Sequence, residues 1–345
     1  MFDSDRSNFI RFLKEFPDQI DASSRLAART QIQSAVKNVQ HIVFAGMGGS
    51  AISGDLLSAF LSDQLTVPVS TVRGYELPGF VNQDTLFIAI SYSGNTEETL
   101  TVTQMAARKG AQIIGLSSGG SLKEFCDRQK STHLKLPEGY PPRQALGFLF
   151  FSLLFLLEKL ELVSVARADI DETRKILLKL RSSLSPESSY GNNLANHIAQ
   201  NVYNNIPVIY TASPLFHPVV VRWRNQFNEN SKAMAFSNVF PELNHNEIMG
   251  WEGPYEVNRH FRVIILRDIK EPERNVHRVK ITKKILKDHK ILVSEVFALG
   301  ASRMARLFSQ IYIGDWASYY LAMIYDKDPI TIDSIDLLKK KLSEI

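Results

Sequence analysis

Two short turns rich in glycine and hydroxyl side chains constrain this chain most, because each follows an apolar run and precedes a helical pattern. The first turn is Gly46-Met47-Gly48-Gly49-Ser50, after the β-type run 41–45. The second is Ser91-Tyr92-Ser93-Gly94-Asn95-Thr96, after the run 85–90. Segments of this kind, repeated along a chain, are typical of a parallel sheet covered by helices. The turns therefore predict an α/β fold in which both lie at the carboxyl ends of parallel strands.

Both turns have the chemistry of a phosphate site. The start of a helix offers unpaired N–H groups and the positive end of the helix dipole, so an anion binds there without a lysine. Glycine allows a ligand to approach the backbone closely, and hydroxyl groups add hydrogen-bond donors. We therefore assign the phosphate of a substrate to Gly49, Ser50, Ser91, Ser93 and Thr96.

Each turn taken alone has a simpler interpretation, as a tight turn followed by a helix cap. The first turn fits neither the G-x-G-x-x-G spacing of dinucleotide sites nor the Walker pattern, which needs Gly-Lys-Ser or Gly-Lys-Thr. The pair of turns, rather than either one, indicates a phosphate site.

Composition narrows the class of protein. The chain has 345 residues, of which 44% are hydrophobic and 22% charged, as in globular proteins with two domains of ordinary size. A net charge of +4 indicates neither a nucleic-acid nor a membrane partner. The strongest apolar run, 145–157, is shorter than the ~20 residues that span a bilayer, so we expect a buried helix there. The start of the chain has none of the features of a signal peptide, and a single cysteine, Cys126, fits a reducing cytoplasm.

Alternating strand and helix patterns predict two copies of one doubly wound, three-layer α/β unit. We expect strands at 41–45, 67–72, 85–90, 112–116, 132–136, 206–210, 261–266 and 291–298. We expect helices at 51–61, from 97, at 143–160, 172–184, 218–228, 274–288 and 304–325. The predicted domains are 1–162, with a helical lead-in at 1–38, and 193–345, joined by a connecting segment at 163–192. The second copy lacks the glycine and hydroxyl turns, so we expect one phosphate site per chain.

A second group of polar residues lies in the second half of the chain. Glu229 is followed sixteen residues later by His245, and a carboxylate with an imidazole suits proton transfer between adjacent carbons and the opening of a cyclic sugar. Arg143, at the start of the apolar helix, is a candidate to stabilise an oxyanion. Glu229 also fits a solvated charge at a helix end, and His245 a structural histidine. His217 is a second candidate for the imidazole, and the motif around His245 favours His245.

These motifs together resemble one family. Its pattern matches five stretches in order along the chain: 46–50, 91–99, Pro142-Arg143, 228–232 and 242–247. On these residues the chain resembles the bifunctional phosphoglucose/phosphomannose isomerases of the sugar isomerase (SIS) domain superfamily. The resemblance implies two SIS domains, each with a five-stranded parallel sheet. It also implies a homodimer whose active site is completed across the subunit interface.

The resemblance implies a metal-independent aldose–ketose isomerase that needs no cofactor and acts on a hexose 6-phosphate. It interconverts fructose 6-phosphate with glucose 6-phosphate, mannose 6-phosphate or both, through a cis-enediolate. Glu229 transfers the proton between C1 and C2, Arg143 stabilises the enediolate, and His245 reaches in from the partner subunit to assist ring opening. Lys339, on the last helix, closes the pocket.

One departure from the family and one rival interpretation stay open. The family often has Asp-Pro-Thr before its last helix, whereas this chain has Asp328-Pro329-Ile330-Thr331, so the relative use of the two C2 epimers stays open. The rival is a sugar-phosphate sensor without catalysis. Such a sensor usually carries an effector module, and residues 1–40 are short for one.

Overall fold

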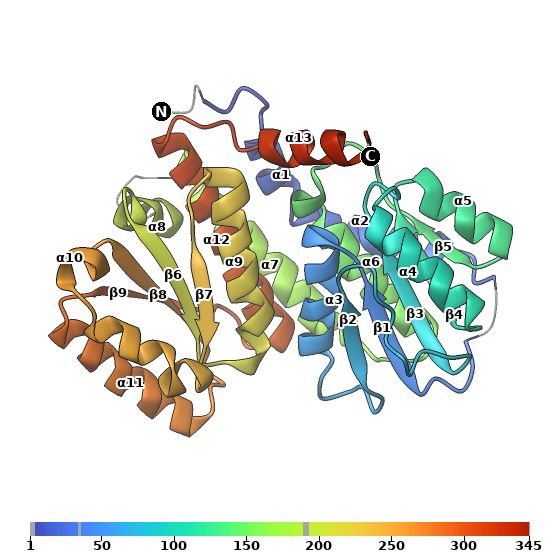
Figure 1. The fold of residues 1–345 in the computed structure, drawn as a ribbon, viewed down its shortest axis with the longest axis horizontal. Helices are drawn as coiled ribbons and strands as arrows, with labels where there is room; N and C mark the ends of the chain where they lie inside the picture. The colour runs from blue at the N-terminus through green and yellow to red at the C-terminus, as the bar shows by residue number, and fades with distance from the viewer. Residues whose placement is uncertain (1–3, 34–35, 189–192, 345) are drawn as a thin grey trace. The chain divides into compact units, whose positions relative to one another are not determined.

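The structure, a computed structural model, describes residues 4–33, 36–188 and 193–344 (Figure 1). It has two compact units: an N-terminal unit, Glu15–Arg174, and a C-terminal unit, which joins Met1–Lys14 to Lys175–Ile345. The domain boundaries predicted at residues 162 and 193 stay predictions. The predicted lead-in 1–38 and connecting segment 163–192 include residues 1–3, 34–35 and 189–192, which lie outside the described residues.

The N-terminal unit is built on a five-stranded parallel sheet in the order β2-β1-β3-β4-β5. Its strands are β1 (His41–Ala45), β2 (Val69–Val72), β3 (Thr85–Ile90), β4 (Gln112–Ser117) and β5 (Thr132–Lys135). Every residue of β3 is buried, as expected for a strand covered on both faces. The strands predicted from the sequence are therefore confirmed, with β2 beginning two residues later than predicted.

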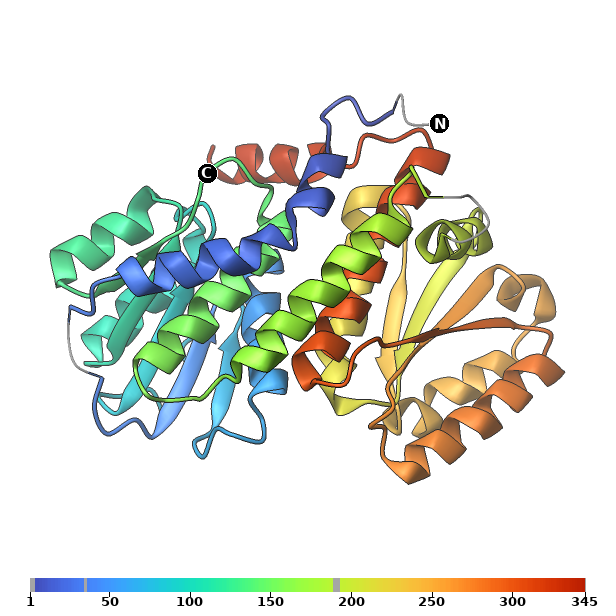
Figure 2. The ribbon, with the colours of Figure 1, turned by 180° about the vertical axis from the view of Figure 1, so that it is seen from behind.

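Helices cover both faces of this sheet. The helices are α2 (Asp18–Arg29), α3 (Gly48–Phe60), α4 (Glu97–Arg108), α5 (Gly120–Gln129) and α6 (Leu146–Lys159). Figure 1 shows α4 and α5 on one face, and Figure 2 shows α2 and α6 on the other. The strand order reverses between β1 and β3, so the chain leaves these two neighbours toward opposite faces and a crevice opens at their carboxyl ends. Both predicted phosphate turns follow these two strands.

The C-terminal unit has a parallel sheet in the order β7-β6-β8-β9. Its strands are β6 (Ile206–Thr211), β7 (Phe236–Val239), β8 (Phe261–Arg267) and β9 (Leu292–Phe297). The resemblance implied five strands here, and this is corrected to four within the described residues. The edge strand β7 was not expected, because Phe236-Ser237-Asn238-Val239 is short, has no fully buried residue and shows no apolar alternation.

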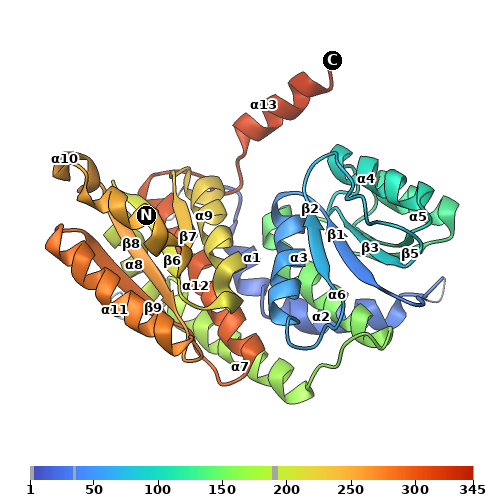
Figure 3. The same ribbon diagram turned by 60° about the horizontal axis from the view of Figure 1, so that its bottom comes forward.

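The helices of the C-terminal unit include one that is almost wholly buried, α12 (Arg303–Ile324), which packs against α9 (His217–Ser231) and α8 (Leu194–Val202). The others are α1 (Ile10–Glu15), α7 (Arg167–Leu184), α10 (Tyr255–Asn258), α11 (Glu273–Asp288) and α13 (Asp333–Leu342). Helices α1 and α7 each extend across a unit boundary. Helix α13 has no buried residue, and Figure 3 shows it extending away from the sheet of its own unit.

In the described part of the chain, we find no helix whose length and hydropathy would let it cross a membrane.

Candidate active site

The first predicted turn lies between β1 and α3, at the crevice of the N-terminal sheet. Gly46 is required there, because a β-carbon on it would lie 2.8 Å from the carbonyl oxygen of Ile90 at the end of β3. Gly48 has φ +50° and begins α3, a conformation that favours glycine. The glycines thus bring the start of α3 directly beside the carboxyl end of β3.

Ser50 joins the two turns. It is buried, and its Oγ accepts a hydrogen bond from the backbone N–H of Tyr92 at 3.3 Å. The structure therefore brings the two turns together, and we call residues 46–50 and 91–96 the cradle. Whether the cradle holds a phosphate stays a prediction.

Ser91 is the centre of the second turn. Its Oγ is fully buried and accepts the backbone N–H of Gly94 at 3.1 Å and of Thr96 at 3.4 Å. It also lies 2.8 Å from Oγ1 of Thr96. Since both lone pairs of Ser91 are used, its O–H donates to Thr96. The Ser91 hydroxyl is thus used by the turn itself, whereas the half-buried Thr96 keeps its own hydroxyl hydrogen for a ligand.

Ser93 is exposed on the same turn, where its Oγ accepts the N–H of Asn95 at 3.3 Å. The turn is backed by α5. Leu122 N–H donates to the carbonyl of Gly94 at 2.9 Å, and Ser121 N–H to Oδ1 of Asn95 at 3.0 Å. The start of α5 therefore holds the second turn of the cradle through backbone hydrogen bonds.

Arg143 lies beside the cradle. It sits in the 3₁₀ turn η1 (Pro142–Gln144) just before α6, rather than in the helix itself as the sequence suggested, and is buried. A β-carbon on Gly49 would lie 3.2 Å from both N and Cα of Arg143 and 3.1 Å from the carbonyl oxygen of Pro142. The absence of a side chain at Gly49 thus lets the backbone of Arg143 pack directly on the start of α3.

Glu229 is on the last turn of α9 in the C-terminal unit, and is half-buried. Its asparagine neighbours hold the helix end. Asn230 Nδ2 donates to Ser318 Oγ of α12 at 2.9 Å, and Asn228 Oδ1 accepts the N–H of Ala235 at 3.0 Å. These amides have a structural role that the sequence pattern did not reveal.

A buried ion pair fixes α9 against α12 farther along. Arg222 donates from Nε and Nη2 to the two carboxylate oxygens of Asp315, at 3.1 and 2.8 Å, and Gln226 adds a third hydrogen bond at 2.8 Å. Burial raises the pKa of Asp315, although Arg222 and Gln226 favour its charged form. This network sets the register of the helix that presents Glu229. The sequence pattern did not predict this network, because Arg222 and Asp315 lie far apart along the chain.

His245 is exposed at the end of the 3₁₀ turn η4 (Glu242–His245). The loop is held by Glu247, which accepts hydrogen bonds from Tyr210 Oη and, at 2.6 Å, from Asn238 Nδ2. Burial, then the neighbouring Glu247, raises the pKa of Tyr210, so its hydroxyl stays protonated and donates. The imidazole of His245 is thus presented at the surface by an anchored loop.

The alternative histidine, His217, begins α9, whereas Glu229 lies near its end. Twelve residues of helix separate them by about 18 Å, so the two side chains of one chain do not act on one bond. Burial lowers the pKa of His217. Lys339 is exposed on α13, so Glu229, His245 and Lys339 lie on three different elements of the C-terminal unit.

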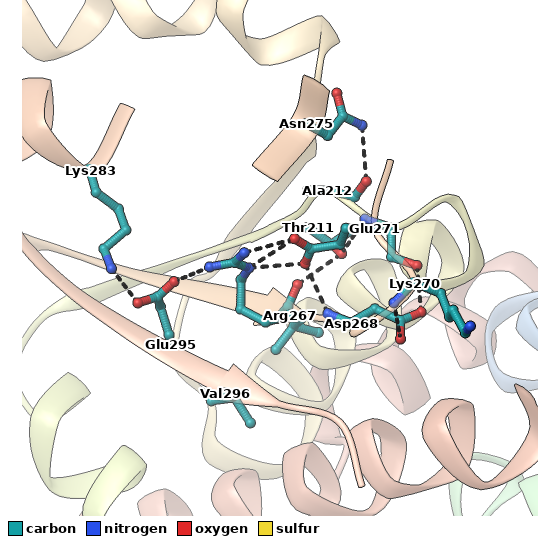
Figure 4. A network of polar contacts seen from close by, with 12 residues as sticks. Thr211, Ala212, Arg267, Asp268, Lys270, Glu271, Asn275, Lys283, Glu295 and Val296 are labelled. Atoms are coloured by element: carbon teal, nitrogen blue, oxygen red, sulfur yellow. Dashed lines mark hydrogen bonds and ion pairs between the residues drawn. The ribbon is translucent and has the colours of Figure 1, made fainter. Parts of the chain in front are cut away.

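The carboxyl edge of the C-terminal sheet, where a second cradle would lie, is occupied by its own side chains (Figure 4). Arg267, at the end of β8, makes paired hydrogen bonds to Glu271 and a further ion pair with Glu295, which also pairs with Lys283. Burial alone would raise the pKa of Glu295, but its hydrogen bonds to Lys283 and Arg267 lower it.

The next residue, Asp268, also occupies this edge of the sheet with its side chain. Its buried carboxylate accepts hydrogen bonds from Arg306 Nε at 2.8 Å and Ser213 Oγ at 3.1 Å. A carboxylate thus already uses the donors that an incoming anion would need. The prediction that the second copy lacks the hydroxyl and glycine cradle agrees with this arrangement.

Two family models and several relatives show the family of this chain. Residues 36–146 match the SIS domain, and residues 191–342 match the bacterial phospho-glucose isomerase C-terminal SIS domain. A bifunctional phosphoglucose/phosphomannose isomerase of Caldicellulosiruptor bescii is 42% identical over 95% of this chain and 97% of its own length. One of Aquifex aeolicus is 36% identical over 88% of this chain and 90% of its own. A crystal structure of a hypothetical protein from Thermus thermophilus has a TM-score of 0.77 at 16% identity, covering 98% of this chain and 91% of that one, which supports the fold.

Proposed function

This chain belongs to the family of bifunctional phosphoglucose/phosphomannose isomerases, and we propose that it interconverts fructose 6-phosphate with glucose 6-phosphate and mannose 6-phosphate. The observation that carries the proposal is the 42% identity to the Caldicellulosiruptor bescii enzyme over 95% of this chain and 97% of the relative. None of the family models and relatives reported above favours the sugar-phosphate sensor. A single cysteine, buried at Cys126, fits a cytoplasmic protein.

In the proposed mechanism the cradle binds the phosphate. The backbone N–H groups at the start of α3 and the hydroxyl of Thr96 donate to its oxygens, and the dipole of α3 favours the negative charge. Binding the phosphate orients the sugar carbons without changing the chemical barrier directly. This is the step to which Gly49, Ser50, Ser93 and Thr96 contribute, while Ser91 shapes the turn.

Proton transfer is assigned to Glu229. Starting from the open-chain aldose, its carboxylate takes the C2 proton, the C1–C2 double bond forms, and the negative charge passes to the oxygen on C1. The hydroxyl proton on O2 then passes to the oxygen on C1, and Glu229 returns its proton to C1 as the carbonyl forms at C2, which gives the ketose. In the reverse direction, protonation of either face of C2 gives glucose or mannose 6-phosphate.

Three cationic or proton-donating groups complete the proposal. The guanidinium of Arg143 stabilises the charge on the enediolate oxygen, a role for which a buried group held against the cradle is suited. His245 assists ring opening, and we propose that it does so in the site of a partner subunit of a homodimer. Lys339 closes the site from α13.

The direct test is a coupled assay with fructose 6-phosphate that follows glucose 6-phosphate and mannose 6-phosphate separately. Formation of both products with the wild-type protein supports the proposal. Tight binding of fructose 6-phosphate without formation of either product would favour the sensor.

A further inference from the structure

A large cavity of the N-terminal unit lies away from the cradle. It has a volume of about 490 Å³, within the range of small-molecule pockets, and is formed by the end of α2, the residues after it, α5 and β5. Figure 1 shows α5 and β5 along one edge of the N-terminal sheet. We call it the basic pocket. Its lining residues are Leu26, Arg29, Thr30, Gln31, Gln33, Lys123, Cys126, Asp127, Lys130, Ser131, His133 and Lys135.

Positive charge dominates this lining. Among the described residues it has four cationic side chains and one carboxylate, Asp127, which pairs with Lys123. Lys135 is 3.7 Å from Glu138, outside the lining. Within the described part of the chain, Arg29 and Lys130 make no ion pair. The pocket therefore holds at least two uncompensated positive charges.

The helix ends that border the pocket do not cancel this charge. Carbonyls at a helix C-terminus repel anions, but Lys159 Nζ donates to the carbonyls of Ala28 at 3.0 Å and Thr30 at 2.8 Å, at the end of α2. At the end of α5 the N–H of Ser131 donates to the carbonyl oxygen of Cys126 at 2.9 Å. Carbonyls at the ends of both helices are thus engaged with donors, those of Ala28 and Thr30 with the ammonium group of Lys159.

The pocket's cysteine and histidine are not reactive charged groups. Burial raises the pKa of Cys126 to about 12, so the thiol stays protonated. Burial, and then the neighbouring Lys123, lowers the pKa of His133 to about 4, so the imidazole is neutral near pH 7. These properties fit reversible binding rather than covalent chemistry.

We propose that the basic pocket is a binding site for a small soluble polyanion carrying two or more phosphate-type charges. Arg29, at the end of α2, and Lys130, directly after α5, supply charge, and Lys123 and Lys135 add to it. Thr30, Gln31, Gln33 and Ser131 offer hydrogen-bonding groups. A volume of about 490 Å³ is more than a single phosphate fills.

Helix α5 connects the basic pocket to the cradle. Its first turn donates to Gly94 and Asn95, and its later residues Lys123, Cys126 and Asp127 line the pocket. A β-carbon on Gly94 would lie 1.8 Å from the carbonyl oxygen of Gly119, so the cradle cannot move far without moving the start of α5. A polyanion in the pocket therefore acts on the Michaelis constant for the sugar phosphate, a regulatory step that rests on the proposed function.

The binding test uses isothermal titration calorimetry with inorganic tripolyphosphate, at an ionic strength of about 150 mM to screen non-specific attraction. We compare the wild type with the pocket variant Arg29→Gln/Lys130→Gln. A matched control, Arg25→Gln/Arg128→Gln, removes two exposed charges from α2 and α5 outside the lining. We expect Kd to rise at least about tenfold for the pocket variant and to stay within about twofold for the control.

Two further readouts separate the pocket from the cradle. Tripolyphosphate raises the pKa of His133 in an NMR titration of the wild type and the control, but not of the pocket variant. Thr96→Val, in the cradle, keeps the binding. Equal weakening in both double variants, absence of binding, or loss of binding in Thr96→Val overturns the proposal.

The effect of the polyanion on the Michaelis constant is tested separately. Tripolyphosphate changes the Michaelis constant for fructose 6-phosphate in the wild type and the control, and not in the pocket variant. Binding of tripolyphosphate with an unchanged Michaelis constant overturns the coupling to the cradle but not the binding site. A protein that binds tripolyphosphate but does not isomerise sugars refutes the proposed function, while the proposed binding site still stands.

Discussion

Gly49 and Arg143 are in backbone contact: a β-carbon on Gly49 would come within 3.2 Å of the N and Cα atoms of Arg143. The contact joins the start of α3 to the turn before α6, although the two residues are far apart in sequence. It means that the position of the guanidinium depends on a residue that has no side chain.

The first prediction follows from this contact. Gly49→Ala forces the η1 turn to shift by a few tenths of an ångström, because the obstructing atoms belong to the backbone. We expect turnover to fall about tenfold with a loss of stability of only about 1–3 kcal/mol. Steady-state kinetics and thermal unfolding measure both. Gly79→Ala, where a β-carbon meets no atom within 4 Å, is the control and is expected to keep its activity.

Removing the hydroxyl of Thr96 and removing that of Ser91 are expected to have different effects. Thr96→Val removes a ligand donor of similar shape, so the Michaelis constant rises while stability changes little. Ser91→Ala leaves the N–H of Thr96 without its acceptor, whereas the N–H of Gly94 keeps the carbonyl oxygen of Ser91 at 3.0 Å. We expect the lost hydrogen bonds to lower the free energy of unfolding by about 1–3 kcal/mol. Kinetics and denaturant titration of both variants check this. Equal effects of the two changes on the Michaelis constant would contradict the division of roles.

Glu229→Gln tests the catalytic base. The amide keeps the size and polarity of the side chain but takes up no proton, so we expect turnover to fall at least about 100-fold with a modest change in the Michaelis constant. The exposed Glu256→Gln on α10 is the matched control. Wild-type turnover in Glu229→Gln would remove this residue from the mechanism.

Mixing variants tests whether the site is shared between subunits. If His245 acts in the partner's site, a heterodimer of Glu229→Gln and His245→Gln chains has one intact site. Random assembly of a two-fold symmetric dimer then restores about one quarter of the wild-type activity. Co-expressed chains with different affinity tags allow the measurement. A purified heterodimer without activity would place both residues in the same subunit's site.

His133 gives a prediction for pH. Its pKa is about 4 in the folded protein, below the ordinary value of 6.5, because burial disfavours the charged imidazole. Between these values the unfolded chain binds more protons, so this contribution to stability is present above about pH 6.5 and is lost as the pH falls toward about 4. Denaturant titrations across this range should show a smaller pH dependence for His133→Gln than for the exposed control His277→Gln.

Local pattern was enough to predict most elements of both sheets. Runs such as 85–90 are continuously apolar because the strand is buried on both faces, and that is a local signal. The edge strand β7 has no such signal, since it is held by pairing with β6 rather than by burial. The grouping of the first residues with the C-terminal unit depends on distant partners: Ser7 Oγ donates to Asp328 at 2.6 Å.

The site shows the same limit. Glycine and hydroxyl residues after strands predicted two turns at one edge of the sheet, and the structure brings them into contact through Ser50 and Tyr92. Which hydroxyl the turn keeps for itself could not be predicted, because the Ser91 hydrogen bonds depend on the folded turn. The basic pocket was missed as well, since Arg29 and Lys130 have no common local pattern.

The closed edge of the C-terminal sheet has a consequence for the history of the fold. If the two units arose by duplication, the second copy cannot regain a ligand edge by one substitution. Losing Asp268 alone leaves the buried Arg306 guanidinium uncompensated, and losing Arg306 alone does the same to the carboxylate. Either change costs about 3–5 kcal/mol, a large part of a typical protein's stability. The difference between the two copies is then difficult to reverse. Later mutations change the one substrate site rather than restore a second one.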